Sequence, residues 1–191
     1  MLSKVNNLIT KEARFPLNQN DYKIIGDLIK EGQPGSVLAC LSQDLITKYI
    51  EISIKSENLF FYICEHDNRI VGYALWAKDS SFLTSEFQNI KYSVLTNLLT
   101  SFKIKAIINI FLSIFKIEFL LLSSDKRNFI NKNLIFTLMA FEKESQSKGM
   151  GTVFCSQMFS DLNKRYNFQT MIVEPYDKRA IYFFKNKFNC K

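Results

Sequence analysis

Residues 134–151, LIFTLMAFEKESQSKGMG, constrain the fold of this chain more than any other stretch. Seven of the eight residues from 134 to 141 are apolar or aromatic, which is typical of a strand covered on both faces. A charged turn and two glycines follow, and apolar residues then recur at helical spacing as far as Arg165. The pattern predicts a buried strand that leaves the core and enters a helix at the glycine pair.

The glycine pair has a chemical meaning at such a junction. Glycines let backbone N–H groups approach a ligand closely, and a helix N-terminus adds free donors and the positive end of the helix dipole. Lys148 adds a positive charge beside them, so a phosphate or pyrophosphate is the expected ligand. The alternative is that the glycines only form a tight turn and that Lys148 is a solvated surface residue. A motif this short supports a binding site only when its structural context agrees.

Gln146, Gly149 and Gly151 match the signature of the acetyl-coenzyme A loop in the GNAT acetyltransferase superfamily, which this chain resembles from residue 12 onward. Residues 69–74, RIVGYA, also resemble the second strand of the hairpin that precedes the central strand in GNAT proteins. The resemblance implies one α/β GNAT-fold domain over residues 1–191, with a mixed central sheet flanked by helices. It implies acetyl-coenzyme A as cosubstrate, no metal, and these cofactor-binding residues: Ala140, Phe141, Gln146, Ser147, Lys148, Gly149, Met150, Gly151, Thr152 and Asp177.

The catalytic residues stay open. The resemblance implies a tyrosine acid in the last helix, but that position aligns with Phe184, which has no proton to give. A carboxylate that some members place in the central strand falls at Ile135. The remaining candidates are Glu142, Glu144 and Tyr182, although carboxylates in a charged turn are more often solvated.

The segments before residue 80 predict the first half of such a domain. Residues 10–17 predict a strand, Asn20-Asp21 a helix cap, and Ser36 or Ser42 the start of a second helix. Residues 59–65 and 69–78 predict a hairpin around a polar turn at 66–68, in which His66 is expected to be exposed and without a role.

The segments after residue 165 predict the second half. Residues 169–173 predict another strand of a parallel pair, and Asp177 is expected to cap a last helix. Its expected inward residues are Ala180, Ile181, Phe184 and Phe188. GNAT proteins usually add a further strand after this helix, and none is expected here, so either the chain is truncated or the sheet edge is open or completed by a partner.

Residues 80–132 predict a helical insertion between the hairpin and the central strand. Within it, residues 107–122 are almost wholly apolar, with a narrow polar stripe at helical spacing. Their 16 residues fall short of the roughly 20 that a bilayer crossing needs. A helix packed on the domain or at a homodimer interface is the first interpretation, and a lid or a helix on a membrane surface are the others.

Composition limits the function classes. The 191 residues are 47% hydrophobic, enough for one domain with a real core, and a net charge of +7 favours acidic partners such as coenzyme phosphates. The lysines are scattered and no nucleic-acid-binding motif appears, so a nucleic-acid role ranks last. Four separated cysteines and one histidine indicate reduced thiols and no metal cluster, and no signal peptide is evident, so the expected location is cytoplasmic, with a membrane-peripheral variant.

We therefore expect an acetyl-coenzyme A-dependent N-acetyltransferase acting on a small amine. The pair Gly35-Ser36 and the insertion resemble GNAT-like proteins found with bacterial surface-polysaccharide genes, which implies an amino sugar as acceptor. A protein N-terminus, a polyamine and an aminoglycoside are alternatives within the enzyme class. A catalytically silent GNAT-fold binding module and a membrane-surface interaction module are the alternatives outside it.

Overall fold

The computed structural model describes residues 7–34, 36–100, 133–167, 170–173 and 178–188. The strands are β1 (Leu8–Glu12), β2 (Leu59–His66), β3 (Arg69–Ala77), β4 (Leu134–Phe141) and β5 (Met171–Val173). The helices are α1 (Gln19–Gly32), α2 (Gln43–Lys55), α3 (Ser80–Ser85), α4 (Lys91–Thr100), α8 (Met150–Tyr166) and α9 (Lys178–Phe188). Short 3₁₀ turns, η1 (Leu38–Cys40), η2 (Gln88–Ile90) and η3 (Lys143–Ser145), complete the described chain.

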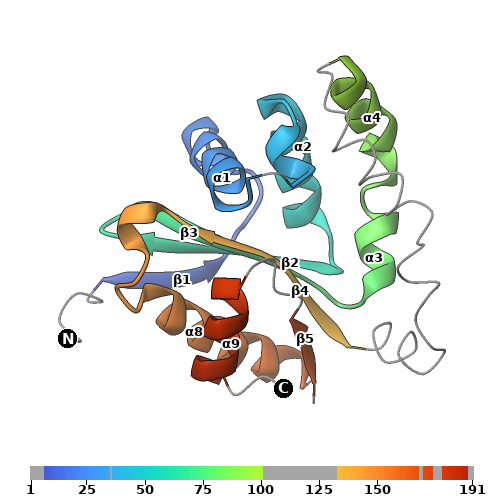
Figure 1. Ribbon diagram of the computed structural model, residues 1–191. Helices are drawn as coiled ribbons and strands as arrows, with labels where there is room; N and C mark the ends of the chain where they lie inside the picture. The colour runs from blue at the N-terminus through green and yellow to red at the C-terminus, as the bar shows by residue number, and fades with distance from the viewer. Residues whose placement is uncertain (1–6, 35, 101–132, 168–169, 174–177, 189–191) are drawn as a thin grey trace.

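One mixed sheet forms the middle layer. Its strand order is β1-β2-β3-β4-β5, with antiparallel pairs from β1 to β4 and a parallel pair between β4 and β5. Helices α1 and α2 cover one face of the sheet, and α8 and α9 cover the other (Figure 1). This arrangement confirms the predicted α/β fold class, the predicted bounds of β4, and a parallel strand at 171–173 within the predicted 169–173.

Strand alternation supplies two separate cores, one on each face of the sheet. Phe61 and Ile63 of β2 pack with α1 and α2, whereas Phe60 and Cys64 of the same strand pack with α8. Side chains of a strand point alternately to opposite faces, so a strand buried on both sides is apolar throughout. This accounts for the unbroken apolar run of β2.

The first strand and helix lie earlier than the sequence predicts. The strand ends at Glu12 rather than near Pro16, and α1 begins at Gln19. Its cap is Asn18, not Asn20-Asp21, because the Asn18 side chain accepts a hydrogen bond from the Asp21 N–H at 2.8 Å. Of the two predicted starts of the second helix, Ser42 is correct, since it is the N-cap of α2 and its side chain accepts from the Leu45 N–H. Ser36 instead accepts from the Ala39 N–H beside η1, whose N-cap is Val37.

The hairpin is confirmed, with a two-residue turn at Asp67-Asn68. Both residues have positive φ, 51° and 63°, the geometry that matches the twist of the paired strands. His66 is the last residue of β2 rather than part of the turn. Its side chain is 25% exposed and its Nδ1 lies 3.4 Å from Asp67 Oδ2, so it is more enclosed than the sequence predicts.

Helices α3 and α4 belong to the predicted insertion, which contacts α2 through Phe87, beside η2, and through Asn97 of α4. The Phe87 ring stacks on Tyr49 with centroids 4.4 Å apart, and Asn97 Oδ1 accepts from the Ser42 N–H at 3.3 Å. The insertion is therefore helical and docked on the domain over residues 80–100. The apolar segment 107–122 lies outside the described residues, and among those described no helix is long and apolar enough to cross a membrane.

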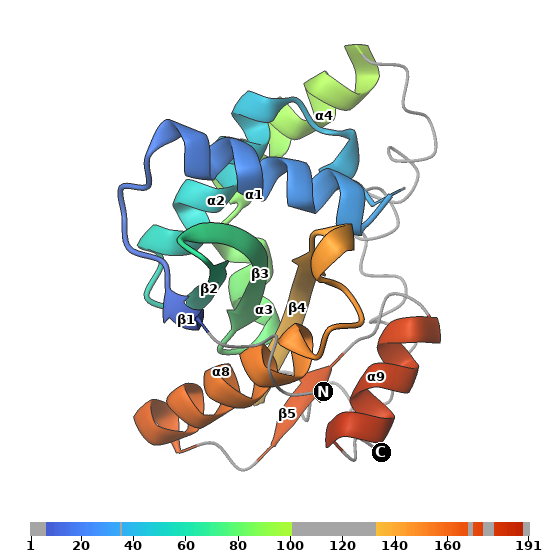
Figure 2. The same cartoon turned by 90° about the vertical axis from the view of Figure 1, so that its left-hand side faces the viewer.

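Helix α9 buries a narrower strip than predicted. Phe184 is 3% exposed and Phe188 is half-buried, but Ile181 is 40% exposed and does not face inward. The helix lies at the outside of the domain (Figure 2), so only the side turned toward β4 and α8 is covered.

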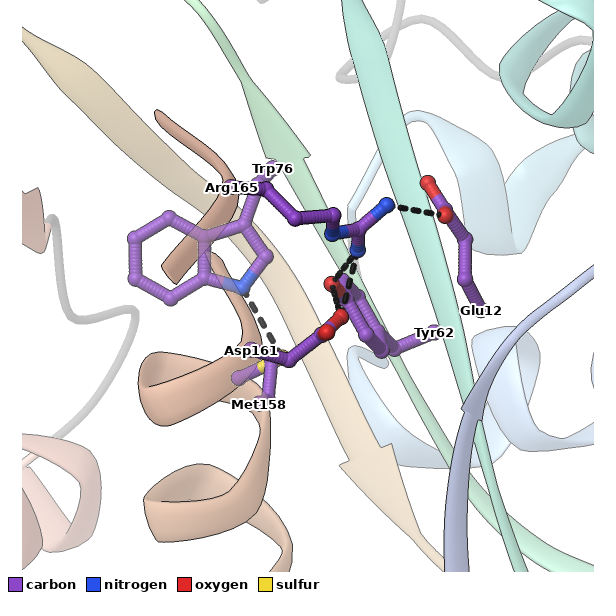
Figure 3. Close-up of polar contacts among 6 residues, drawn as sticks. All are labelled: Glu12, Tyr62, Trp76, Met158, Asp161 and Arg165. Atoms are coloured by element: carbon purple, nitrogen blue, oxygen red, sulfur yellow. Dashed lines mark hydrogen bonds and ion pairs between the residues drawn. The ribbon is translucent and has the colours of Figure 1, made fainter. Parts of the chain in front are cut away.

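A polar cluster ties α8 to the first two strands (Figure 3). Arg165 donates to Glu12 Oε2 at 2.7 Å and to Asp161 Oδ2 at 2.5 Å, and it also contacts the Tyr62 hydroxyl. Tyr62 in turn donates to Asp161 at 2.5 Å. The cluster holds the C-terminal half of α8 on the sheet, far along the helix from its glycine-rich start.

Two buried thiols make stability sensitive to alkaline pH. Burial, with a smaller contribution from Glu65, raises the pKa of Cys64 from 9.0 to about 12, and burial also raises that of Cys155. The unfolded chain therefore loses these protons first, so their contribution is intact below the unfolded pKa and is lost as pH rises toward the folded one. We expect unfolding free energy to fall by up to about 1.4 kcal/mol per pH unit per thiol above pH ~9.

Urea titrations at a series of alkaline pH values measure this dependence. Because Ala cannot ionise, the Cys64→Ala variant should show a shallower fall than the wild type between about pH 8 and 9.5, where most tyrosines of the unfolded chain are still protonated. Equal slopes would contradict the assignment of this sensitivity to Cys64.

Candidate functional site

Among the described residues, the central strand β4 pairs with its neighbour β5 over only the first part of its length. The two strands pair only from Leu134 to Phe136, opposite Met171 to Val173. At that point the register with β3 slips: Leu75 pairs with Leu138 and Trp76 with Phe136, which leaves Thr137 as an extra residue. A bulge of this kind bends its strand, and here it coincides with the end of the β4–β5 pairing.

The bulge also reverses which face of the sheet the even-numbered residues of β4 point to. Before it, Leu134 and Phe136 pack toward α8, whereas after it Leu138 and Ala140 turn to the α1 and α2 side. The sequence shows no such reversal, because apolar residues occupy both faces.

Beyond Phe136, the side of β4 that faces β5 has no strand partner among the described residues, and we call this unpaired side of residues 137–141 the gap. Glu142 N–H donates to Val71 C=O at 2.9 Å, so Glu142 is hydrogen-bonded to β3. In an antiparallel ladder such residues alternate with residues whose peptide groups point the other way. The N–H and C=O groups of Met139 and Phe141 therefore face the β5 side, where the described part of β5 provides no partner.

The loop after β4 delivers a helix N-terminus to the same place. Gly149 has a φ of +81°, and α8 begins at the next residue, Met150. No side chain of the described residues caps this helix, and its first turn holds no acidic residue. The first N–H groups of a helix have no partner within it, so the start of α8 is open to an anion.

Gly151 sits in the first turn of α8 beside two aromatic rings. A Cβ placed on it would lie 3.7 Å from Phe183 and 3.8 Å from Phe141, an ordinary contact distance. The helix start, the end of β4 and the inner side of α9 thus meet at this glycine. The side of β4 without a described strand partner thus presents backbone groups, and the positive end of helix α8 lies near its last residues.

The turn between β4 and α8 is held by its own side chains. Gln146 Nε2 donates to Phe141 C=O at 2.9 Å. Arg69, at the end of the hairpin, donates to both carboxylate oxygens of Glu142 at 2.9 and 3.1 Å, and Ser145 Oγ donates to Glu142 at 2.7 Å. Glu142 therefore anchors the loop through an ion pair.

The other predicted site residues differ in how far their side chains are exposed to solvent. Ser147 and Lys148 are exposed at the loop tip and Thr152 is half-buried in the first turn of α8. Met150 is 3% exposed, so only its backbone can reach a ligand, and Ala140 turns its side chain to the α1 face. Asp177 lies outside the described residues.

The catalytic candidates are not brought together at the gap. Glu144 is exposed at the loop and Tyr182 is 72% exposed on α9. Phe184 and Ile135 are core residues, 3% and 6% exposed, and the Phe184 ring packs against Phe136 at 5.3 Å. No group of three metal-ligating side chains occurs among the described residues.

Two residues at the gap have no place in the sequence-based prediction, Met139 and Phe183. The backbone of Met139 faces the gap because the bulge sets the direction of its peptide groups. A continuous run of apolar residues gives no sign of that direction. Phe183 enters through its contact with Gly151. In the sequence, the only signal for Phe183 is its place next to Phe184 in the predicted last helix.

Gly149 offers a test of the loop geometry. Its φ of +81° disfavours any residue with a Cβ, while no atom lies within 4 Å of the position a Cβ would take. Gly149→Ala should therefore lower the unfolding free energy by about 1–2 kcal/mol through backbone strain alone. Urea denaturation measures this, and Gly149→Asn is the matched variant, because Asn tolerates this conformation better and should lose less.

Comparisons with known proteins identify chains of similar fold. No protein-family model and no curated protein sequence matches the chain. Among solved structures, a possible acetyltransferase from Clostridium difficile 630 is 15% identical, with 97% of this chain and 93% of that chain covered and a TM-score of 0.53. A predicted acetyltransferase with acetyl-CoA from Clostridium acetobutylicum is 14% identical, with 93% and 86% covered and a TM-score of 0.51.

A third similar structure is an aminoglycoside acetyltransferase from an uncultured soil metagenomic sample, in complex with trehalose. It is 13% identical, with 97% of this chain and 91% of that chain covered and a TM-score of 0.52. Identities this low establish a shared fold and nothing finer. The chain therefore has the fold of the GNAT acetyltransferases, as the resemblance of its sequence predicts.

Proposed function

We propose that this protein is an acetyl-coenzyme A-dependent N-acetyltransferase for a small amine. The observation that carries the proposal is the gap beside β4, where no described strand pairs with the backbone of Met139 and Phe141, together with a start of α8 that no described side chain caps. A long, flexible ligand with an anionic end suits such a gap. Among the similar folds, one structure is described as containing acetyl-CoA.

In this proposal each part of the site has a separate task. The N–H groups at the start of α8 bind the pyrophosphate, with Lys148 as a mobile countercharge. The peptide groups of Phe141 and Met139 hold the pantetheine chain as a neighbouring strand would. Gly151 puts no side chain between this helix start and the rings of Phe141 and Phe183.

The reaction requires the amine lone pair to attack the thioester carbonyl, with the thiolate leaving. A backbone N–H of β4 that points into the gap can stabilise the developing oxyanion. Holding the two reactants together supplies much of the remaining acceleration. We assign no acid or base, because Glu142 is occupied by Arg69 and Phe184 has no titratable group.

For the acceptor we propose an amino sugar, nucleotide- or lipid-linked. The net charge of +7 supports an acceptor that carries an anionic group, since a positive surface attracts it and repels polycations. Strand β5 lies at the edge of the described sheet.

Calorimetric titration of acetyl-CoA, followed by thiol release assays with an amine panel, tests the proposal. We expect binding with a Kd in the micromolar range, near −8 kcal/mol, and turnover with at least one amine. Absence of binding would refute it. Binding without turnover would favour the second candidate, a catalytically silent coenzyme-binding module, which the core position of Phe184 supports.

A further inference from the structure

The side-chain hydroxyl of Tyr73 has no hydrogen-bond partner among the described residues, although it is fully buried. The residue is 0% exposed on β3 and belongs to the core between the sheet and helices α1 and α2. A buried hydroxyl without a partner costs free energy that Phe would not. A hydrogen-bond partner for this hydroxyl would therefore stabilise the protein, and no described residue provides one.

The surroundings of Tyr73 are aromatic. Its ring stacks on Phe61 with centroids 5.7 Å apart. Burial and, to a smaller extent, Tyr49 raise the pKa of its hydroxyl above the usual range, so it stays neutral and can both donate and accept. Tyr49 carries the Phe87 ring of the insertion on its face, so this part of the core lies beneath the insertion.

Tyr73 is also next to the proposed reaction site. It pairs directly with Ala140 of β4, between Met139 and Phe141, whose backbone groups face the gap. The side chains of Tyr73 and Ala140 both lie on the α1 and α2 side. Because the proposed coenzyme contacts lie toward α8 and α9, an acceptor must approach from the side of Tyr73.

We propose that the Tyr73 hydroxyl binds a neutral polar group of the acceptor, a hydroxyl or carbonyl oxygen, beside the acetyl group. This inference rests on the proposed function and specifies its acceptor side. A neutral partner fits because the surrounding cluster is apolar and aromatic.

The first test compares melting temperatures of the free protein and two variants. Tyr73→Phe removes a hydroxyl without a partner, so the melting temperature should stay the same or rise. Tyr62→Phe is the matched control in the neighbouring strand, because the Tyr62 hydroxyl donates to Asp161. That control should melt about 2–4 °C lower. A comparable fall for Tyr73→Phe would overturn the inference, since the hydroxyl would then have a partner, such as a water, in the free protein.

The second test uses pairs of amines that differ in hydroxyl groups, tyramine with phenethylamine and D-glucosamine with cyclohexylamine. The wild type should prefer the hydroxyl-bearing member by about tenfold or more in kcat/KM, and Tyr73→Phe should lose that preference with unchanged acetyl-CoA affinity. A preference that survives the substitution, or no turnover of any pair by a protein that binds acetyl-CoA, would count against the inference. Failure to bind acetyl-CoA would instead refute the proposed function, and the melting comparison would still decide whether the hydroxyl lacks a partner.

Discussion

Gly151→Glu is expected to weaken acetyl-CoA binding by about 100-fold or more, because like charges brought together in a binding site cost several kcal/mol. The new carboxylate would leave the first turn of α8 between Phe141 and Phe183, where the proposed site receives a pyrophosphate. It would also occupy the helix start with a negative charge of its own. Calorimetric titration measures the loss.

Gly151→Ala is the matched control for that experiment. A Cβ at this position meets Phe183 and Phe141 at 3.7–3.8 Å, which is ordinary van der Waals contact, so binding should be largely retained. Circular dichroism must show that both variants fold. If the Glu variant folded and bound acetyl-CoA like the wild type, the start of α8 would not be the anion site.

Trp76→Ala is expected to lower the unfolding free energy by about 3–5 kcal/mol, the range for deleting a large buried aromatic side chain. Trp76 is 0% exposed, and its ring packs against Phe136 at 4.7 Å and Phe159 at 5.5 Å. Its Nε1–H also donates to Met158 Sδ at 3.0 Å. The side chain thus joins β3, β4 and α8 at the base of the gap.

Urea denaturation measures the effect, with Trp76→Phe as the control. Phe keeps much of the ring contact but leaves a smaller cavity and no donor for Met158, so its loss should be clearly smaller than that of Ala. A loss below about 1 kcal/mol for Trp76→Ala would contradict the packing described here, since changes at surface sites are usually within about 0.5 kcal/mol.

Part of the site follows from local chemistry and was predictable on that basis. Gly149 and Gly151 mark the junction because a left-handed residue and a close approach both favour glycine. The hairpin turn at Asp67-Asn68 likewise follows from residues that tolerate positive φ. Gln146 was correctly placed in the loop, although its hydrogen bond to Phe141 depends on how the loop folds back.

Other features depend on which segments meet in space. Glu142 was a candidate catalytic carboxylate, but Arg69, far away in sequence, holds it with two hydrogen bonds. Ile181 has the helical spacing of a buried residue, yet α9 is covered on too narrow a side to bury it. Neither outcome has a local signal.

The sequence by itself determined the elements around the site: an apolar strand at 134–141, a glycine-rich turn and an amphipathic helix. These follow from periodicity and from backbone preferences, which are properties of neighbouring residues. Only the tertiary structure decided where the strand bulges, because Thr137 becomes an extra residue through its register with β3. That register turns Met139 and Phe141 toward the gap and leaves the Tyr73 hydroxyl buried beside Ala140, since strand pairing joins residues that the chain order keeps apart.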